Sequence, residues 1–189
     1  METKLRFLQE IDKLKLIERK ALIHTGTRLE NSAEHSWHLA MAVLVMYPLK
    51  KDIDLLLALK MALLHDVVEI DADDVIIYGD NSQKSVKEMA AANRIFGILD
   101  ASDFKKIWQD FEEKKSAEAK FVGALDRFLP IFSNYLNKGY SWKKHNIFYE
   151  QVVEKNKMPI QAGIPELWEI VEDMLQETIA AGNLQKRKN

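Results

Sequence analysis

The sequence predicts an all-α protein that folds as a single domain. Apolar residues recur three or four positions apart along most of the chain, and no run alternates between apolar and polar residues convincingly enough for a strand. The 189 residues include only 7 glycines and 4 prolines, a composition typical of a helix-rich protein. One hydrophobic core suits this length, so we expect one domain over residues 1–183 and a disordered tail over residues 184–189.

Three helices are expected before residue 71. The first runs from the N-terminus to about residues 21–23, and its apolar stripe repeats every three positions: Leu5, Leu8, Ile11, Leu14 and Ile17. A capping-box pattern of Asn31 with Glu34 starts the second helix, and Pro48 stops it. The third starts at residues 52–54 and continues to Ile70. Because it is apolar almost all round, we expect it to be central and buried.

The second half of the chain continues with helices. Residues 71–81 lose the helical period and are expected to form a loop. Start signals for the following helices are a capping box at Ser85 and Glu88, Ser102 with Asp103, Ser116, and Pro165 in the first turn of the last helix. Gly182 is expected to end that last helix.

Charge and composition exclude several classes of protein. The formal net charge of −2 and the isoelectric point near 6.2 provide no field for a polyanion, so no nucleic-acid polymer is expected as a partner. The longest apolar stretch, residues 39–47, is too short for a bilayer, and the mixed-charge start does not resemble a signal peptide. There is no cysteine, which removes disulfides, thiolate metal sites and thiol nucleophiles. We expect a cytoplasmic protein with no membrane partner.

The pair His65-Asp66 is the strongest functional signal in the sequence. It lies in an aliphatic run that extends from Leu63 to Val68. An unpaired polar group in a core costs a few kcal/mol and an unpaired charge costs more, so a buried imidazole beside a buried carboxylate needs a compensating partner. A bound metal ion would be such a partner.

Two further residues of the same chemistry, His35 and Asp126, also lie in apolar surroundings. A single histidine or aspartate in a helix is more often satisfied by packing and hydrogen bonds than by a metal. As a group, however, two imidazoles and two carboxylates would form a mixed nitrogen and oxygen site. Such a site leaves coordination positions open, unlike a closed structural zinc site. Glu69 follows Asp66 by three residues and would lie on the same face of a helix.

The order of these residues resembles the H...HD...D signature of the HD-domain metal-dependent phosphohydrolases. The likeness continues in the flanking sequences and is similar to the small 5'-deoxynucleotidase-like branch. The matching segments are residues 28–37, 65–74, 91–96 and 121–127.

This resemblance implies an HD-domain helical bundle that binds one divalent metal ion, which would be Mn, Co, Mg, Fe, Ni or Zn. Its ligands would be His35, His65, Asp66 and Asp126.

The same resemblance assigns the other functional residues. Glu69 and Asp74 are implied in catalysis, and Arg19, expected at the end of the first helix, is implied in binding the substrate phosphate. Arg28 is a second candidate for that phosphate, and its alternative is an ion pair with Glu30 or Glu34. The relatives usually carry glycine before the second catalytic acid, where this chain has Asp73. That difference leaves the placement of Asp74 open.

The expected function is the removal of phosphate from a small phosphomonoester by metal-activated water, above all from a (deoxy)nucleoside 5'-monophosphate. The ion would polarise the phosphoryl group and lower the pKa of a bound water, so no cysteine or serine nucleophile is needed. The alternatives are a phosphodiesterase or nucleoside triphosphatase of the same superfamily, or a non-catalytic nucleotide-binding helical module. The relatives are commonly dimers, so a homodimer is expected.

Overall fold

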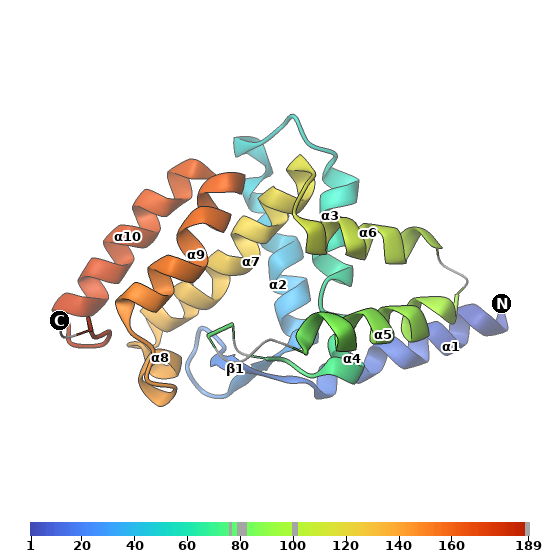
Figure 1. Ribbon diagram of the computed structural model, residues 1–189, viewed down its shortest axis with the longest axis horizontal. Coiled ribbons are helices and arrows are strands. Elements are labelled where there is room, and N and C mark those ends of the chain that lie inside the picture. Colours follow the sequence, from blue (N-terminus) through green and yellow to red (C-terminus); the bar gives the residue numbers. More distant parts are fainter. Residues whose placement is uncertain (76, 79–82, 100–101, 188–189) are drawn as a thin grey trace.

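The computed structural model describes residues 1–75, 77–78, 83–99 and 102–187, and these ranges form helices and one small β-hairpin (Figure 1). The predicted all-α fold class is confirmed. The α-helices are α1 (Glu2–Ile11), α2 (Ser32–Met46), α3 (Leu55–Leu64), α4 (Glu69–Ala72), α5 (Lys84–Gly97), α6 (Ser102–Glu113), α7 (Ala117–Leu136), α8 (Tyr140–Lys144), α9 (Tyr149–Gly163) and α10 (Pro165–Ala180). The other elements are strands β1 (Glu18–Leu22) and β2 (Leu29–Asn31) and two 3-10 helices, η1 (Asp12–Leu16) and η2 (Tyr47–Leu49).

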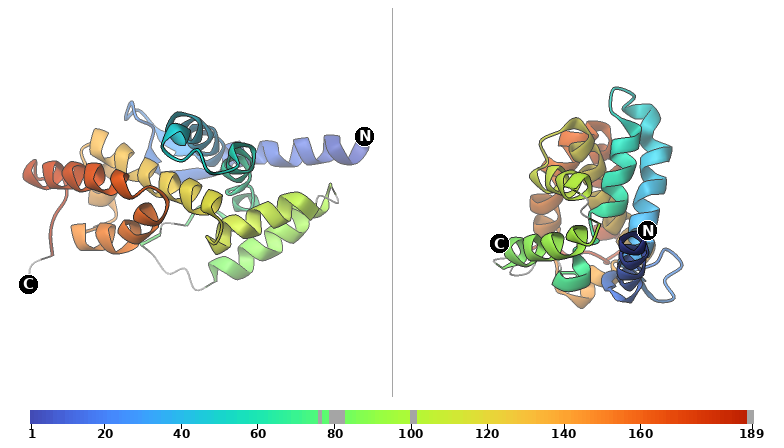
Figure 2. Two further views of the ribbon diagram at one scale, coloured as in Figure 1. Left: turned by 90° about the horizontal axis from the view of Figure 1, so that it is seen from above. Right: turned by 90° about the vertical axis from the view of Figure 1, so that its right-hand side faces the viewer.

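Helix α7 is at the centre of the fold. It packs against α2, α3, α6, α9 and α10. In Figures 1 and 2, α9 and α10 lie toward one end of the molecule, and α1, α5 and α6 lie toward the other. The buried face of α7 carries Phe121, Leu125 and Ile131, which are at most 2% exposed. Full burial of an apolar side chain of this size stabilises the fold by about 1.5–3 kcal/mol.

The N-terminal segment differs from the single long helix that the sequence predicts. Helix α1 ends at Ile11, η1 follows, and the chain is extended from residue 18. An apolar repeat of three matches the three residues per turn of a 3-10 helix better than the 3.6 of an α-helix. Along the predicted stripe, Leu14 is buried, but Leu5 and Leu8 are 60% and 59% exposed. The expected helix to residues 21–23 is therefore wrong.

Strands β1 and β2 form an antiparallel hairpin in which Glu18 pairs with Asn31 and Leu22 with Leu29. Gly26, with φ of 73°, lies in the connecting turn. Charged residues fill the first three positions of β1, so the sequence has no apolar alternation there and the strand was not expected. The hairpin leads directly into α2.

The second and third helices begin as predicted. The side chain of Asn31 accepts a hydrogen bond from Glu34 N, and the Glu34 carboxylate accepts one from Asn31 N, which completes the capping box of α2. Helix α3 begins after its N-cap, Asp54. It ends at Leu64 rather than at Ile70, and residues 65–68 form a turn before α4.

Most later start signals are confirmed, with one correction. Ser116 caps α7 by accepting a hydrogen bond from Ala119 N at 3.1 Å, and Pro165 begins α10. Helix α5 begins at Lys84, one residue before the predicted cap at Ser85. Ser85 is therefore inside the helix and cannot act as its cap, and Glu88 pairs with Lys84 one turn earlier on α5. Part of the predicted loop over 71–81 lies outside the described residues.

The C-terminal residues 184–187 have defined contacts, whereas the sequence predicts a disordered tail from residue 184. Leu184 is 3% exposed, Tyr149 N donates to Gln185 O at 2.9 Å, and Arg187 N donates to the Glu150 carboxylate at 3.0 Å. Residues 188–189 lie outside the described residues, and the domain boundary at residue 183 stays a prediction. Among the helices of the described ranges, none has the length and apolar character needed to cross a bilayer.

Candidate metal centre

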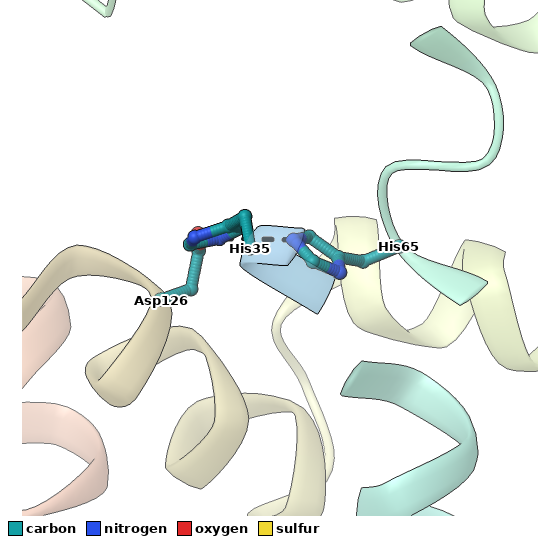
Figure 3. Close-up of side chains that lie close together, drawn as sticks. All are labelled: His35, His65 and Asp126. Carbon is teal, nitrogen blue, oxygen red and sulfur yellow. Dashed lines mark hydrogen bonds and ion pairs between the residues drawn. The ribbon is translucent and has the colours of Figure 1, made fainter. Parts of the chain in front are cut away.

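Three ligand-type side chains from distant parts of the sequence meet in the interior. His35 comes from α2, His65 from the C-terminal end of α3, and Asp126 from α7 (Figure 3). His35 Nε2 lies 3.0 Å and His65 Nε2 lies 3.7 Å from Asp126 Oδ1. One ligand atom from each residue lies within 4.8 Å of the others. Two ligands on opposite sides of an ion at about 2.1 Å each would be about 4 Å apart, so this cluster has the size of a metal site.

Asp66 lies at the edge of this cluster. Its Oδ1 atom is 3.0 Å from His65 Nε2, and its Oδ2 atom accepts a hydrogen bond from Arg19 Nη1 at 2.9 Å. The structure thus gathers all four predicted ligands, with three in the compact group and the fourth shared with an arginine. One carboxylate oxygen of Asp66 remains directed toward the histidine.

The contacts of the two histidines leave their Nε2 atoms for the cluster. His65 Nδ1 lies 2.9 Å from Ala62 O, which favours the tautomer with the proton on Nδ1, and His35 Nδ1 lies 3.5 Å from Glu30 Oε2. His65 Nε2 is fully buried, and within the described residues it has no contact with hydrogen-bond geometry. An unsatisfied buried nitrogen is costly, and a cation at this point would satisfy it. The donor set therefore fits a divalent metal ion.

The electrostatics of the cluster also favour a cation. Burial opposes protonation of His65, but the carboxylates of Asp66 and Asp126 outweigh it and raise the pKa of His65 to about 10. The pKa of His35 is raised as well, against the effects of burial and Arg19. Conversely, the histidines hold the pKa values of Asp66 and Asp126 below the usual range despite burial. Without a metal ion, protons provide the positive charge that these carboxylates attract.

Arg19 lies in strand β1, so the prediction that it ends the first helix is wrong, but its side chain does reach the cluster. Its Nη1 atom contacts Asp66 and lies 3.9 Å from Asp74 Oδ1, and its Nε atom lies 3.5 Å from Glu30 Oε2. The side chain is 12% exposed. Although burial opposes the charge, the carboxylates of Asp66 and Asp74 raise the pKa of Arg19, which stays cationic. The strand positions this arginine between three acids.

Glu69 is a buried carboxylate beside the cluster. It is 5% exposed, and Ser32 Oγ donates a hydrogen bond to its Oε2 atom at 2.6 Å. Burial first, and the charge of Asp66 second, raise the pKa of Glu69 to about 8. In the metal-free protein both its protonated and its ionised form are therefore accessible near neutral pH, as transfer of a proton requires.

Asp74 reaches the same region, since it lies near Arg19, and burial raises its pKa. The preceding residue, Asp73, has φ of 62° and ψ of 158°. That backbone region is essentially restricted to glycine. The family resemblance implies glycine at this position in the relatives, and glycine adopts this backbone conformation without strain.

A cavity opens beside the cluster and contains about 870 Å³ of empty space, part of it open to solvent. Charged residues of its lining include Arg19, Lys84, Asp66, Glu69 and Asp74. Apolar and aromatic lining residues include Val75, Tyr78, Ile131, Trp142 and Ile147.

Arg28, the other predicted phosphate ligand, is not among the residues that line this cavity. Its Nη1 and Nη2 atoms donate to the two carboxylate oxygens of Glu34 at 2.8 and 2.7 Å. The side chain is 55% exposed. The structure therefore brings Arg19 to the site and pairs Arg28 with the capping glutamate of α2.

Sequence reasoning assigned no role in the site to several side chains that belong to it. Glu30 contacts both His35 and Arg19, and Ser32 binds Glu69. Lys114 lies over the ring of Phe111, which packs against His65, and burial lowers the pKa of this lysine to about 8. Glu30 and Ser32 lie in the segment 28–37 that resembles the phosphohydrolases, and this resemblance could have marked them as part of the site. No comparable signal marks Lys114.

Comparison with known proteins identifies the class of this chain. The model of the HD domain family matches residues 11–168. The chain therefore belongs to the HD domain family.

The most informative relatives are 5'-deoxynucleotidases. The chain is 29% identical to 5'-deoxynucleotidase HDDC2 of Homo sapiens over 167 residues, which cover 82% of this chain and 79% of the human protein. It is also 29% identical to the Danio rerio protein of the same name over 133 residues, 67% of this chain and 65% of that one. The predicted resemblance to 5'-deoxynucleotidase-like HD proteins is confirmed.

Solved structures agree with this result. A crystal structure of a predicted metal-dependent phosphohydrolase from Magnetospirillum magnetotacticum MS-1 is 35% identical, covers 97% of both chains and superposes with a TM-score of 0.91. A conserved hypothetical protein from Pyrococcus furiosus, 20% identical with a TM-score of 0.64 over 91% of this chain and 99% of that one, shares the fold.

Proposed function

We propose that this protein is a cytoplasmic, metal-dependent phosphohydrolase that removes phosphate from a small phosphomonoester, above all a (deoxy)nucleoside 5'-monophosphate. The observation that carries the proposal is the buried group of His35, His65 and Asp126, with Asp66 at its edge, beside a cavity lined by further acids and Arg19. A structural metal site would have no use for an open cavity or for a protonatable carboxylate such as Glu69.

In this proposal His35, His65, Asp66 and Asp126 hold one divalent ion. Their mixture of imidazole and carboxylate donors suits Mn, Co, Fe, Ni or Zn, and Mg remains among the candidates. When bound, such an ion supplies Lewis acidity toward a phosphoryl oxygen and makes water more acidic.

The other charged residues of the chain bind the phosphate and move protons. Arg19 is held in place by the three acids around it, and its guanidinium can pair with phosphate oxygens. Glu69, with its pKa near 8, accepts a proton from water or returns one to the leaving oxygen. Ser32 fixes the orientation of Glu69 by donating to one of its oxygens. Asp74 is the second candidate for proton transfer.

The residues that line the cavity support a nucleotide as substrate. The lining includes Asp66 and Asp126 of the metal cluster, and its aromatic residues Tyr78 and Trp142 can pack against an uncharged organic group. The relatives named 5'-deoxynucleotidases support a (deoxy)nucleoside as that group.

The test is a panel of phosphorylated metabolites assayed with added Mn²⁺, Co²⁺ or Mg²⁺. We expect orthophosphate release from nucleoside 5'-monophosphates. Release of pyrophosphate from triphosphates, or cleavage of diesters alone, would instead support the alternative reactions of the superfamily. A metal-loaded protein that hydrolyses none of these compounds would contradict the proposal and favour a non-catalytic binding module.

Two matched variants separate catalysis from folding. Glu69→Gln keeps the acceptor for Ser32 but removes the titratable group, so kcat should fall about 10²–10⁴-fold while the metal content stays unchanged. Asp71→Asn changes a carboxylate on the same short helix that instead receives a 2.8 Å hydrogen bond from Arg94 at the surface. It should retain activity. Equal activity of both variants would remove Glu69 from the mechanism.

We also propose that two copies of the chain associate. Exposed apolar side chains follow one another along α2, at Trp37, Met41, Leu44 and Val45, and a second copy would cover such a surface. The molar mass in solution tests this proposal, because a monomer at micromolar concentration would contradict it.

A further inference from the structure

We propose that Lys84 is a second phosphate-binding cation of the cavity and makes the site selective for doubly charged phosphate monoesters. This inference rests on the proposed phosphohydrolase function and goes further by assigning a residue and the ionic form of the substrate. Neither the sequence motif nor the metal cluster includes Lys84.

The position of Lys84 supports this role. It is the first residue of α5, and this helix packs against α4, which carries Glu69. Lys84 lines the same cavity as Arg19, Asp66 and Glu69. A substrate phosphate beside the metal cluster would therefore have Arg19 from strand β1 and Lys84 from helix α5 within the same cavity.

A buried acid holds the lysine in place. Glu88, one turn further along α5, is 7% exposed, and its Oε1 atom lies 3.4 Å from Lys84 Nζ. Glu112 and Asp66 add negative charge nearby, and together these acids raise the pKa of Lys84 although burial opposes this. The side chain of Lys84 is 36% exposed and stays cationic beside its acid partner, whereas Lys20, which also lines the cavity, is an exposed residue.

The charges that line the cavity explain why Lys84 matters for a substrate. The acids of the lining are Asp66, Glu69, Asp74 and Asp126, and the cations besides Lys84 are Arg19, Lys20 and Arg127. A divalent ion and Arg19 together carry three positive charges against the three aspartates, so binding of a phosphate draws on the remaining cations of the lining. A phosphate monoester carries close to two negative charges at pH 7, because its second pKa is about 6. A phosphodiester carries one, so it depends less on an additional cation.

The experiment compares Lys84→Gln with the matched control Lys87→Gln, an exposed lysine of the same helix. Both proteins are loaded with Mn²⁺ and assayed with dAMP and with bis(p-nitrophenyl) phosphate. Binding of inorganic phosphate is measured by calorimetry as a readout that needs no turnover. Lys84→Arg tests rescue by charge, and thermal unfolding establishes that each variant is folded.

We expect Lys84→Gln to weaken phosphate binding and to lower kcat/KM for dAMP about 10- to 100-fold, mainly through KM, as for loss of one charge-assisted contact. The diester rate should change less than about threefold, because only one charge is bound. Lys84→Arg should recover most of the binding, and Lys87→Gln should behave like the wild type. Glu88→Gln should cause a smaller loss, since it only positions the lysine.

The outcomes separate this inference from the proposed function. If the wild type hydrolyses dAMP and Lys84→Gln binds phosphate as tightly as the wild type, the role of Lys84 is overturned. Equal losses for the monoester and the diester would overturn the selectivity. If the wild type hydrolyses no monoester but binds inorganic phosphate, and Lys84→Gln binds it more weakly, the proposed function fails and the phosphate contact of Lys84 is supported.

Discussion

At the scale of single residues, the centre depends on contacts that direct each donor atom inward. His65 Nδ1 is paired with Ala62 O, and Asp126 Oδ1 faces both histidines. The four candidate ligands could be predicted because their order matches a known metal motif and because His65 and Asp66 lie in an aliphatic run. Lys84 and Lys114 could not be predicted, because lysines are common on protein surfaces and the partial burial of these two results from tertiary packing alone.

Glu69 gives a pH dependence of stability in the metal-free protein. Its raised pKa means that the fold prefers the protonated form, whereas in the unfolded chain the residue ionises above about pH 4.5. The stability contributed by protonated Glu69 is therefore present below pH 4.5 and is lost as the pH rises to about 8. The glutamine of Glu69→Gln cannot ionise. The free energy of unfolding of this variant should therefore rise, relative to that of the wild type, by on the order of a few kcal/mol between pH 4.5 and 8.5.

Urea unfolding of both proteins in EDTA at several pH values measures this difference. Asp71→Asn is the control, and its free energy of unfolding should not rise in this way relative to that of the wild type. A stability difference between wild type and Glu69→Gln that is the same at pH 4.5 and 8.5 would mean that Glu69 has an ordinary pKa.

Asp73 gives a second prediction at this scale. A non-glycine residue at its φ of 62° and ψ of 158° costs about 1–3 kcal/mol. Asp73→Gly removes that cost, and part of the gain is offset by the greater freedom of glycine in the unfolded chain. We expect a net increase of about 1 kcal/mol in the free energy of unfolding. Asp73→Ala removes the carboxylate but keeps the strain, so equal stabilities of the two variants would contradict this explanation.

At the scale of elements, the long helices were predictable because their caps are local. Asn31 with Glu34 and Ser116 each make the predicted capping bonds. The hairpin could not be predicted, because β1 gains its hydrogen bonds from β2 and its burial from the helices packed on it. As a result, the phosphate-binding candidate Arg19 was expected on a helix and lies on a strand.

The packing of α7 against α9 can be tested with two glycines. A Cβ atom added to Gly163 would lie 2.2 Å from Lys120 O and 2.7 Å from Ala124 Cβ, so the helices would have to separate. We expect Gly163→Ala to lower the free energy of unfolding by about 2–4 kcal/mol. A Cβ at Gly97 of α5 meets nothing within 4 Å. Gly97→Ala should be neutral or stabilising by up to about 1 kcal/mol, and equal effects would refute the close contact.

At the scale of the whole molecule, three segments that are distant in sequence must meet for the site to exist. The packing of α2, α3 and α7 around a common core brings His35, His65 and Asp126 together. The order of the motif in the sequence predicted which residues would meet. The cavity shape could not be predicted, because it depends on how α7, α8 and α9 pack together.

The central claim is that this group binds one divalent ion. The most direct measurement is the metal content of purified protein after loading with Mn²⁺ and removal of excess metal, for the wild type, Asp126→Ala and the exposed control Asp173→Ala. We predict one ion per chain in the wild type and in Asp173→Ala, and a loss of most bound metal in Asp126→Ala. Equal metal content in wild type and Asp126→Ala, or no metal in the wild type, would contradict the claim.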